Sequence, residues 1–248
     1  MDQVYIPKIR NGMPAGSYVV IRPLNLELKK QAPILYNIKE LEPVKIGLIE
    51  QIFSVIDSKT ETENIIITGS FLEKGFNFND IDVIIIAETQ SRGIEKEIKE
   101  KTKIETHVIF FDNQLFIKAL KTDPIYRLML SKCISRKRLT PLPEKKLNYR
   151  YLDAQLIKSK SLILSFDYID GKEKYKLTRN LMAIHLFVKN KTLSINHIEK
   201  EIKKQLGIGI EDLKNNLTDN NFLRKYKTFY NGLEGEIIKN AGKQEKAD

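Results

Sequence analysis

Residues 64–86 read NIIITGSFLEKGFNFNDIDVIII. The run 64–68 is short, apolar and rich in β-branched residues, which is the pattern of a strand covered on both faces. Gly69-Ser70 breaks that strand, and a short turn followed by a loop over 71–79 leads to a second buried strand, 81–87. Two buried strands joined by so short a connection predict the centre of a compact α/β domain.

The flanking sequence extends this unit in both directions. The upstream segment 43–58 begins with a proline, which suits the first turn of a helix, and its apolar residues recur at helical spacing. Downstream, a charged surface helix or loop over 91–101 precedes a third strand, 104–111, and a helix, 113–121, that Asp112 can cap. The order of elements predicts a sheet with helices packed against it.

Acidic residues gather where the strands of this unit begin. Asp80 and Asp82 are two positions apart, so alternation along a strand points both carboxylates to one face of the sheet. Neighbouring carboxylates repel each other unless a cation lies between them, and hard oxygen ligands suit Mg²⁺ or Mn²⁺. The next strand adds Glu105 as a third acid, with His107 on the same face as a supporting partner or substrate contact. These residues predict a two-metal site.

Gly69 and Ser70 are expected to bind a phosphate group beside that site. Gly69 has no side chain, so the backbone can approach a ligand closely, and Ser70 offers a hydroxyl. Free amides at the start of the following turn also favour an anion. Together with a metal site, this pair predicts a place for the phosphate tail of a nucleoside triphosphate.

These motifs resemble those of the polymerase β-like nucleotidyltransferase superfamily, in its minimal nucleotidyltransferase form. The family's signature is a strand ending in Gly-Ser, then Asp-x-Asp, then a third acid on a later strand; the resemblance covers roughly residues 44–125. It implies that Asp80 and Asp82 hold both metals and that Glu105 binds the metal that activates the acceptor hydroxyl. Two departures are visible: the third acid is Glu where the family mostly has Asp, and the Arg often found just after Gly-Ser is missing.

Charge is distributed unevenly along the chain. Residues 1–125 carry 16 Lys and Arg against 18 Asp and Glu, whereas residues 126–248 carry 26 against 14. The basic half predicts an anionic partner such as nucleic acid, although lysines on helix surfaces would give the same composition. A single cysteine excludes a disulfide scaffold, and no apolar run approaches the ~20 residues that span a bilayer. We expect a cytoplasmic protein with no membrane association.

The predicted fold class is α+β: a nucleotidyltransferase α/β domain with a mixed sheet, followed by a C-terminal α-helical bundle. The expected boundaries are 1–125 for the first domain with its N-terminal extension, 126–150 for a basic connector, 151–241 for the bundle and 242–248 for a flexible tail. Within the extension, 16–22 has the pattern of a strand. Apolar stripes at helical spacing predict four or five short helices in the bundle.

Two patterns in the second half carry further hypotheses. Arg179 and His185 resemble the Arg-x(4–6)-His signature of HEPN domains, some of which are RNases, and the resemblance implies that both handle a scissile phosphate across a dimer. On one helix the two side chains point about 120° apart, so a histidine at the edge of a core stripe is the favoured alternative. Several aromatic residues lie among basic ones, as base-stacking residues do, but helical spacing favours a core role for Tyr226, Phe229 and Tyr230. They are Tyr149, Tyr151, Tyr226, Phe229 and Tyr230.

The sequence therefore predicts a metal-dependent nucleotidyltransferase that uses Mg²⁺ or Mn²⁺ and a nucleoside triphosphate. The acceptor hydroxyl belongs to RNA, a protein or a small molecule, and the basic half tilts the expectation slightly towards RNA. A homodimer is one assembly compatible with this prediction. Two alternative hypotheses are a catalytically inactive nucleic-acid-binding or toxin-neutralising protein, and an RNase that uses the helical domain.

Overall fold

The computed structural model describes residues 32–244, so the predicted strand 16–22 and the last four residues of the predicted tail lie outside the described residues. The strands are β1 (Ile34–Tyr36), β2 (Asn64–Thr68), β3 (Asp80–Ile86), β4 (Glu105–Phe111) and β5 (Cys133–Ser135). The helices are α1 (Pro43–Lys59), the 3₁₀ turn η1 (Ser70–Leu72), α2 (Ile94–Thr102), α3 (Asn113–Thr122), α4 (Pro124–Leu130), α5 (Tyr149–Leu164), α6 (Gly171–Val188), α7 (Ile195–Leu206), α8 (Ile210–Lys214) and α9 (Asn220–Gln244).

The strands form one mixed sheet in the order β1-β5-β2-β3-β4. β3 and β4 run parallel, with α2 as the crossover between them, whereas the other pairs are antiparallel. The predicted α+β class with a mixed sheet is confirmed. Because β2 and β3 are neighbours, the end of β2 and the start of β3 meet at the same edge of the sheet.

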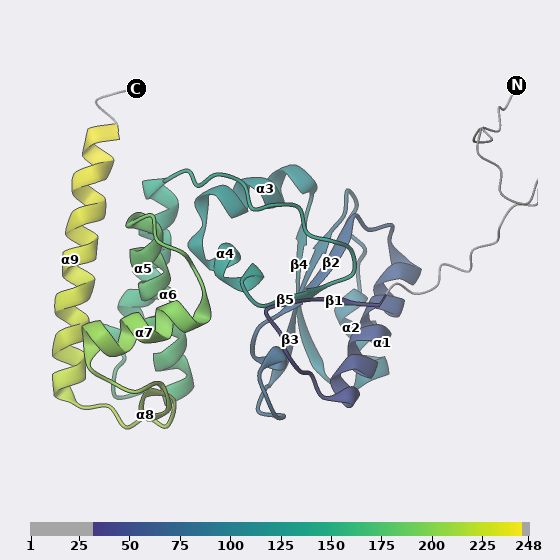
Figure 1. The fold of residues 1–248 in the computed structure, drawn as a ribbon, viewed down its shortest axis with the longest axis horizontal. Coiled ribbons are helices and arrows are strands. Elements are labelled where there is room, and N and C mark those ends of the chain that lie inside the picture. Colours follow the sequence, from purple (N-terminus) through teal and green to yellow (C-terminus); the bar gives the residue numbers. More distant parts are fainter. Residues whose placement is uncertain (1–31, 245–248) are drawn as a thin grey trace, which may run out of the picture. The chain divides into compact units, whose positions relative to one another are not determined.

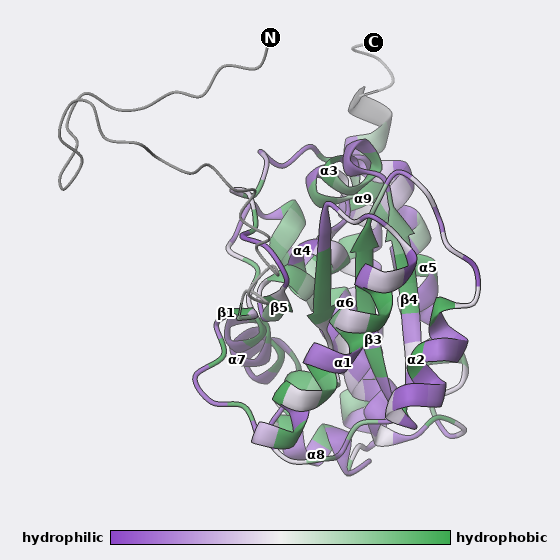
Figure 2. Cartoon of the chain, turned by 90° about the vertical axis from the view of Figure 1, so that its right-hand side faces the viewer, coloured by the Kyte–Doolittle hydropathy of each residue, from purple (hydrophilic) through white to green (hydrophobic). Residues whose placement is uncertain are grey.

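Helices cover both faces of the sheet, which explains why its central strands are apolar on both sides. On one face, α1 and α2 pack against the odd-numbered side chains of β3, such as Ile81 and Val83 (Figure 1). On the other face, α3 and α4 pack against Ile84 and Ile86. Figure 2 shows the middle strands in the colour of hydrophobic residues, while α2 presents mainly hydrophilic ones (Figure 2).

The remaining helices, α5 to α9, enclose a second apolar core. α6 is its central element, because Leu181 through Ile184 are fully buried there. Leu128 of α4 packs into this core, whereas Leu130, two residues later, packs under the sheet. α4 therefore joins the two cores, which a seven-residue helix can do because its successive side chains point in different directions.

The stretch expected as a basic connector, 126–150, contains more structure than its composition indicates. It begins inside α4, and β5 pairs with both β1 and β2, so the sheet draws a strand from beyond residue 125. β5 is only three residues long, too short for a periodic pattern. The expected tail also starts late, because α9 continues to Gln244. In the part described here, no helix has the length and apolar character needed to cross a bilayer.

Candidate functional site

The acids of the motif lie at the start of β3, on the face of the sheet that α3 and α4 cover further along. Asp80 and Asp82 share this face with Ile84, because side chains alternate along a strand. In the parallel pairing of β3 with β4, Asp80 lies opposite Glu105 and Asp82 lies opposite His107. Four polar side chains therefore come from one corner of the sheet, as the alternation in the sequence indicates.

Gly69 brings the backbone between β2 and η1 into contact with Asp82. Its φ of +86° and ψ of −163° belong to a region that is open essentially to glycine alone. A Cβ at this position would lie 2.2 Å from Asp82 Oδ2. Ser70, the first residue of η1, is exposed beside this contact. The Gly-Ser and Asp-x-Asp segments are therefore in direct contact in the folded chain.

Asp82 carries a charge that its surroundings compensate only in part. Burial raises the pKa of the Asp82 carboxyl, and the neighbouring charge of Asp80 raises it further. His107 Nδ1 lies 3.4 Å from Asp82 Oδ1, and this contact lowers the same pKa without cancelling the effect of burial. Burial and the neighbouring charge destabilise the ionised form of Asp82, and a nearby cation would stabilise that form.

Glu105, the expected third acid, forms an ion pair with Lys99 of α2, and the two side chains are 62% and 56% exposed. Within residues 32–244, no three His, Cys, Asp or Glu side chains are grouped closely enough to hold a metal ion. Because an exposed ion pair contributes at most about 1 kcal/mol, Glu105 can leave Lys99 at little cost. Neighbouring strands lie about 4.8 Å apart, so a rotated Glu105 side chain comes within reach of Asp80.

Asp80 and Asp82 themselves fit a divalent cation of the Mg²⁺ type. Both offer hard carboxylate oxygens from a rigid strand, which is the donor chemistry that Mg²⁺ and Mn²⁺ prefer. No lysine or arginine of the described residues forms a salt bridge with either of them. Asp112, in contrast, caps α3 by accepting a hydrogen bond from the Leu115 amide at 2.7 Å. Its expected role as a helix cap is confirmed.

A buried lysine fixes the loop that joins the two halves of the motif. Lys45 of α1 is fully buried, its Nζ donates to the Glu73 carbonyl oxygen at 2.5 Å, and it lies 3.1 Å from the Glu42 carboxylate. Three rings of the same loop surround the ammonium at 5.4–5.6 Å from their centroids: Phe71, Phe76 and Phe78. Sequence reasoning missed this role, because a lysine in an amphipathic helix normally indicates the exposed face.

Glu42 completes this clamp. Its carboxylate accepts a hydrogen bond from the Gly75 amide at 2.6 Å, and this bond is the main reason why the pKa of Glu42 falls to about 2. Lys45 lowers the same pKa further. The loop between Ser70 and Asp80 is therefore held to the start of α1 by paired charges and backbone contacts, which keeps Gly69 against Asp82.

The first half of α6 also contacts this loop. Lys172 Nζ donates to Asn77 Oδ1 at 2.8 Å. Further along the helix, the charge of Arg179 acts on Asp82 and lowers the pKa of its carboxyl. Sequence reasoning paired Arg179 with His185 instead. The seven-residue spacing between Lys172 and Arg179 places both on one helix face, and this is the sequence signal that links Arg179 to the residue that binds the loop.

His185 lies in a different environment from Arg179. Its ring packs edge-to-face on Phe229 with centroids 5.1 Å apart, and burial lowers the pKa of the imidazole. Glu201 raises that pKa in part. Arg179 instead lies beside Tyr175 and Asn180, and the position of His185 matches a histidine at the edge of the helical core.

The aromatic residues of the second half serve mainly the core. Tyr226 and Tyr230 are almost completely buried, and Phe229 and Tyr149 pack against the same cluster. Tyr151 is the exception, with 46% of its surface exposed. The core role favoured from helical spacing is therefore confirmed for Tyr226, Phe229 and Tyr230.

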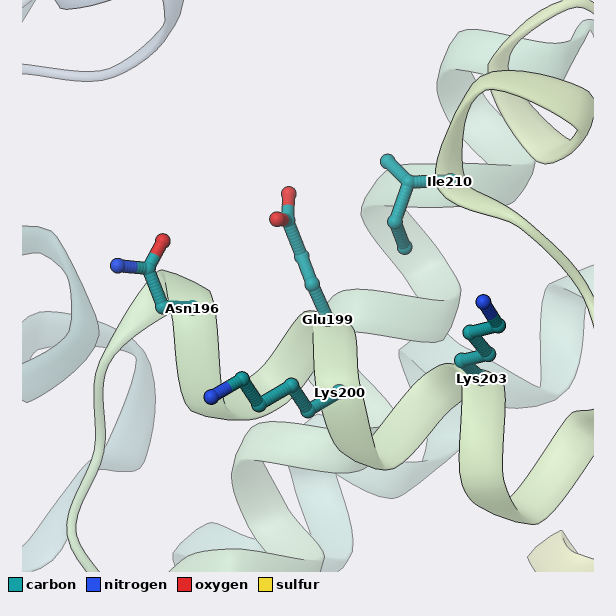
Figure 3. Close-up of a pocket in the computed structure, with 5 residues that line it drawn as sticks. All are labelled: Asn196, Glu199, Lys200, Lys203 and Ile210. Carbon is teal, nitrogen blue, oxygen red and sulfur yellow. The ribbon is translucent and has the colours of Figure 1, made fainter.

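An open pocket of about 360 Å³ lies between α7 and the start of α8 (Figure 3). Four polar or charged residues and one apolar residue line it: Asn196, Glu199, Lys200, Lys203 and Ile210. Glu199 also accepts a hydrogen bond from the hydroxyl of Tyr175 on α6 at 3.0 Å. This bond connects the pocket to the helix that carries Arg179.

A scan against models of known protein families finds no match to this chain, and a search of curated proteins finds none either.

Proposed function

We propose that this protein is a metal-dependent nucleotidyltransferase of the polymerase β-like type, which transfers a nucleoside monophosphate from a nucleoside triphosphate to an acceptor hydroxyl. The observation that supports the proposal most is the contact between the two halves of the motif. Asp82, beside Asp80, lies against Gly69, where a side chain would collide with it. An incompletely compensated pair of carboxylates next to an exposed serine suits a cation that carries a phosphate group.

The reaction assigns a role to each of these residues. The acceptor oxygen forms a bond to the α-phosphorus, the bond from that phosphorus to the bridging oxygen breaks, and pyrophosphate leaves while the acceptor proton passes to solvent. Bound Mg²⁺ or Mn²⁺ would neutralise the triphosphate and lower the pKa of the acceptor hydroxyl. Asp80 and Asp82 hold the cations, Gly69 leaves room for the phosphate tail, and Ser70 donates its hydroxyl to a phosphate oxygen. Phosphoryl transfer needs little more than such positioning and charge.

Glu105 is proposed as the third metal ligand. It lies opposite Asp80 in the strand register, and the exposed pair that it forms with Lys99 is weak. Cation binding at Asp80 would favour rotation of Glu105 away from Lys99, because a divalent charge attracts the carboxylate more strongly than a solvated ammonium does.

RNA is the acceptor that the charge distribution favours. The half of the chain beyond residue 125 carries 26 basic against 14 acidic residues, and a phosphate backbone is the anionic partner most commonly bound by such a surface. A protein hydroxyl and a small molecule are the other acceptors that the same site chemistry serves, and the assay below separates the three.

The test is transfer of label from α-labelled ATP, CTP, GTP or UTP to bulk RNA, protein or small molecules, with Mg²⁺ or Mn²⁺ present. We expect transfer from one of the four nucleotides, and its loss in the double variant Asp80→Ala with Asp82→Ala. Glu88→Gln is the matched control, because it removes one exposed negative charge just beyond the far end of β3. Transfer that persists in the double variant would refute the proposed role of these acids.

A second candidate is a catalytically inactive protein that binds nucleic acid or neutralises a toxin. The observed pairing of Glu105 with Lys99, rather than with Asp80, favours it, because binding without catalysis needs no third metal ligand. Retention of RNA with no label transfer from any nucleotide would support this candidate. RNA cleavage that survives the double variant and disappears in His185→Ala would instead indicate a nuclease in the helical domain.

A further inference from the structure

The first half of α6 turns a basic stripe towards the motif. Lys172, at the start of the stripe, is bonded to Asn77 in the loop between η1 and β3. Arg179 follows seven residues later, and seven residues are nearly two full turns, so it lies on the same helix face about 10 Å further along the axis. Tyr175 lies between them on this face; burial, then Glu199, and least of all Glu73 of the same loop raise the pKa of its hydroxyl. The face that carries Arg179 is therefore the one that meets the candidate site.

Arg179 has a buried donor that no residue of the range 32–244 accepts from. A guanidinium offers five N–H donors. Its Nη2 reaches only Asn180 Oδ1, at a long 3.4 Å, and its Nε is buried with no hydrogen-bond partner among residues 32–244. Burying a charged donor without a partner is unfavourable. The unpaired Nε of Arg179 is explained if an anion binds beside the guanidinium when the protein binds its ligand.

Neighbouring groups hold Arg179 in place. The guanidinium carbon lies 6.0 Å from the ring centroid of Tyr175. The Tyr175 hydroxyl is fixed in turn by Glu199, and Lys214 Nζ lies 4.8 Å from the same ring. Residues of α7 and α8 thus hold Tyr175 in place, and the observed support of Arg179 is an aromatic ring rather than a salt bridge to an acid.

Three lysines around the motif already form ion pairs. Lys45 binds Glu42 and the Glu73 carbonyl oxygen, and Lys132 lies 3.0 Å from the Glu73 carboxylate. The third, Lys99, pairs with Glu105. A triphosphate carries more negative charge than cations held between two aspartates can balance, so a further positive group with free donors is needed.

We propose that Arg179 of α6 binds the terminal phosphates of the nucleoside triphosphate, so that the helical domain completes the nucleotide site formed by Gly69, Ser70, Asp80 and Asp82. This inference rests on the proposed nucleotidyltransferase function and adds the residue that recognises the triphosphate. The planar guanidinium fork matches two phosphate oxygens at once, which an ammonium group cannot do.

The experiment measures nucleotide affinity of the full chain by isothermal titration calorimetry in Mg²⁺, with ATP, CTP, GTP and UTP and with the corresponding monophosphates. For the triphosphate that binds the wild type, Arg179→Gln is expected to weaken affinity about 10- to 100-fold, the range for a charge-assisted hydrogen bond. Monophosphate affinity is expected to change less than about twofold, because the lost contact is to the terminal phosphates. Arg224→Gln is the matched control, since this exposed arginine of α9 bonds only to Asn221.

Arg179→Lys provides a second variant that keeps the charge and removes the fork, so it should lose affinity by an intermediate factor. Thermal melting of each variant shows that it is folded, and Arg179→Lys carries the test if Arg179→Gln is not. Unchanged triphosphate affinity in the folded variants, or equal losses for triphosphate and monophosphate, would overturn the role of Arg179 and leave the proposed function standing. A wild type that binds no triphosphate with either Mg²⁺ or Mn²⁺ would overturn both.

Discussion

Replacing Asp82 with asparagine should stabilise the protein when divalent cations are absent. Asp80 and Asp82 are two residues apart on β3, which corresponds to about 6.6 Å along a strand. Over that distance, two negative charges repel by ~0.6 kcal/mol in water and by ~2.5 kcal/mol at the effective dielectric constant of a protein surface. The variant also loses part of the contact with His107, worth at most about 1 kcal/mol. We therefore expect the free energy of unfolding to rise by about 1 kcal/mol, which is roughly 2–4 °C in Tm.

Divalent cations should act on the wild type and not on the variant. At a Mn²⁺ concentration ten times its Kd, mass action adds about 1.4 kcal/mol to the stability of a protein that binds it only when folded. The asparagine variant retains one carboxylate of the pair and should gain little. Thermal melting by circular dichroism, first in EDTA and then across a Mn²⁺ titration, measures both effects. Glu88→Gln is the control and should keep the full response to Mn²⁺.

The pH dependence of the same variant follows from the raised pKa of Asp82. Ionisation of Asp82 disfavours the folded state, so the advantage of asparagine is complete above the pKa of the folded protein. It should shrink as the pH falls towards the ordinary value of 3.8, where the wild-type carboxyl becomes protonated in both states. A lower Tm for Asp82→Asn in EDTA at neutral pH, together with an equal Mn²⁺ response in both proteins, would refute the reasoning.

Three further predictions concern the backbone and the loop clamp. Gly69→Ala should abolish label transfer, because its Cβ would displace the Asp82 carboxylate. Gly75→Ala is the control, because Gly75 has a similar φ of +83° but a Cβ there would meet no atom within 4 Å. This control should cost about 1–2 kcal/mol of stability without abolishing transfer. Glu42→Gln should destabilise the protein at neutral pH, because the lowered pKa of Glu42 contributes stability above pH 4.5. The difference in stability between wild type and variant should disappear as the pH falls from 4.5 to about 2, which melting curves recorded across this pH range measure. Gly171→Ala should cost about 1–3 kcal/mol in urea unfolding, because its Cβ would lie 2.2 Å from the Lys214 carbonyl oxygen, and an unchanged midpoint would contradict this packing.

Long elements with a repeating apolar pattern could be predicted from the sequence. The helix expected over 43–58 is observed as Pro43–Lys59, and the strand expected over 64–68 is observed with the same bounds. Such patterns are local: each apolar stripe or run identifies its own buried face before any partner is known. The capping residue Asp112 sets the start of α3 for the same reason.

The shortest elements were not predicted from the sequence. β1 and β5 are three residues each, so their assignment depends on hydrogen bonds to a partner strand rather than on their own composition. The start of α4 is indicated by the sequence, because Asp123 caps the helix and Pro124 follows it. Most of α4 nevertheless lies in the stretch that was expected to be a basic connector. A short helix contributes too few residues for a periodic pattern to outweigh the surrounding composition.

Strand alternation and the Gly-Ser break are properties of neighbouring residues, so they already identify the face of β3 that carries the acids and the residues that flank it. Other features arise only in the folded chain: Gly69 touches Asp82, Glu105 pairs with Lys99, and the charge of Arg179 acts on Asp82 while His185 packs on Phe229. Those outcomes depend on charges and side chains brought together from distant segments, whose pairing no local pattern encodes.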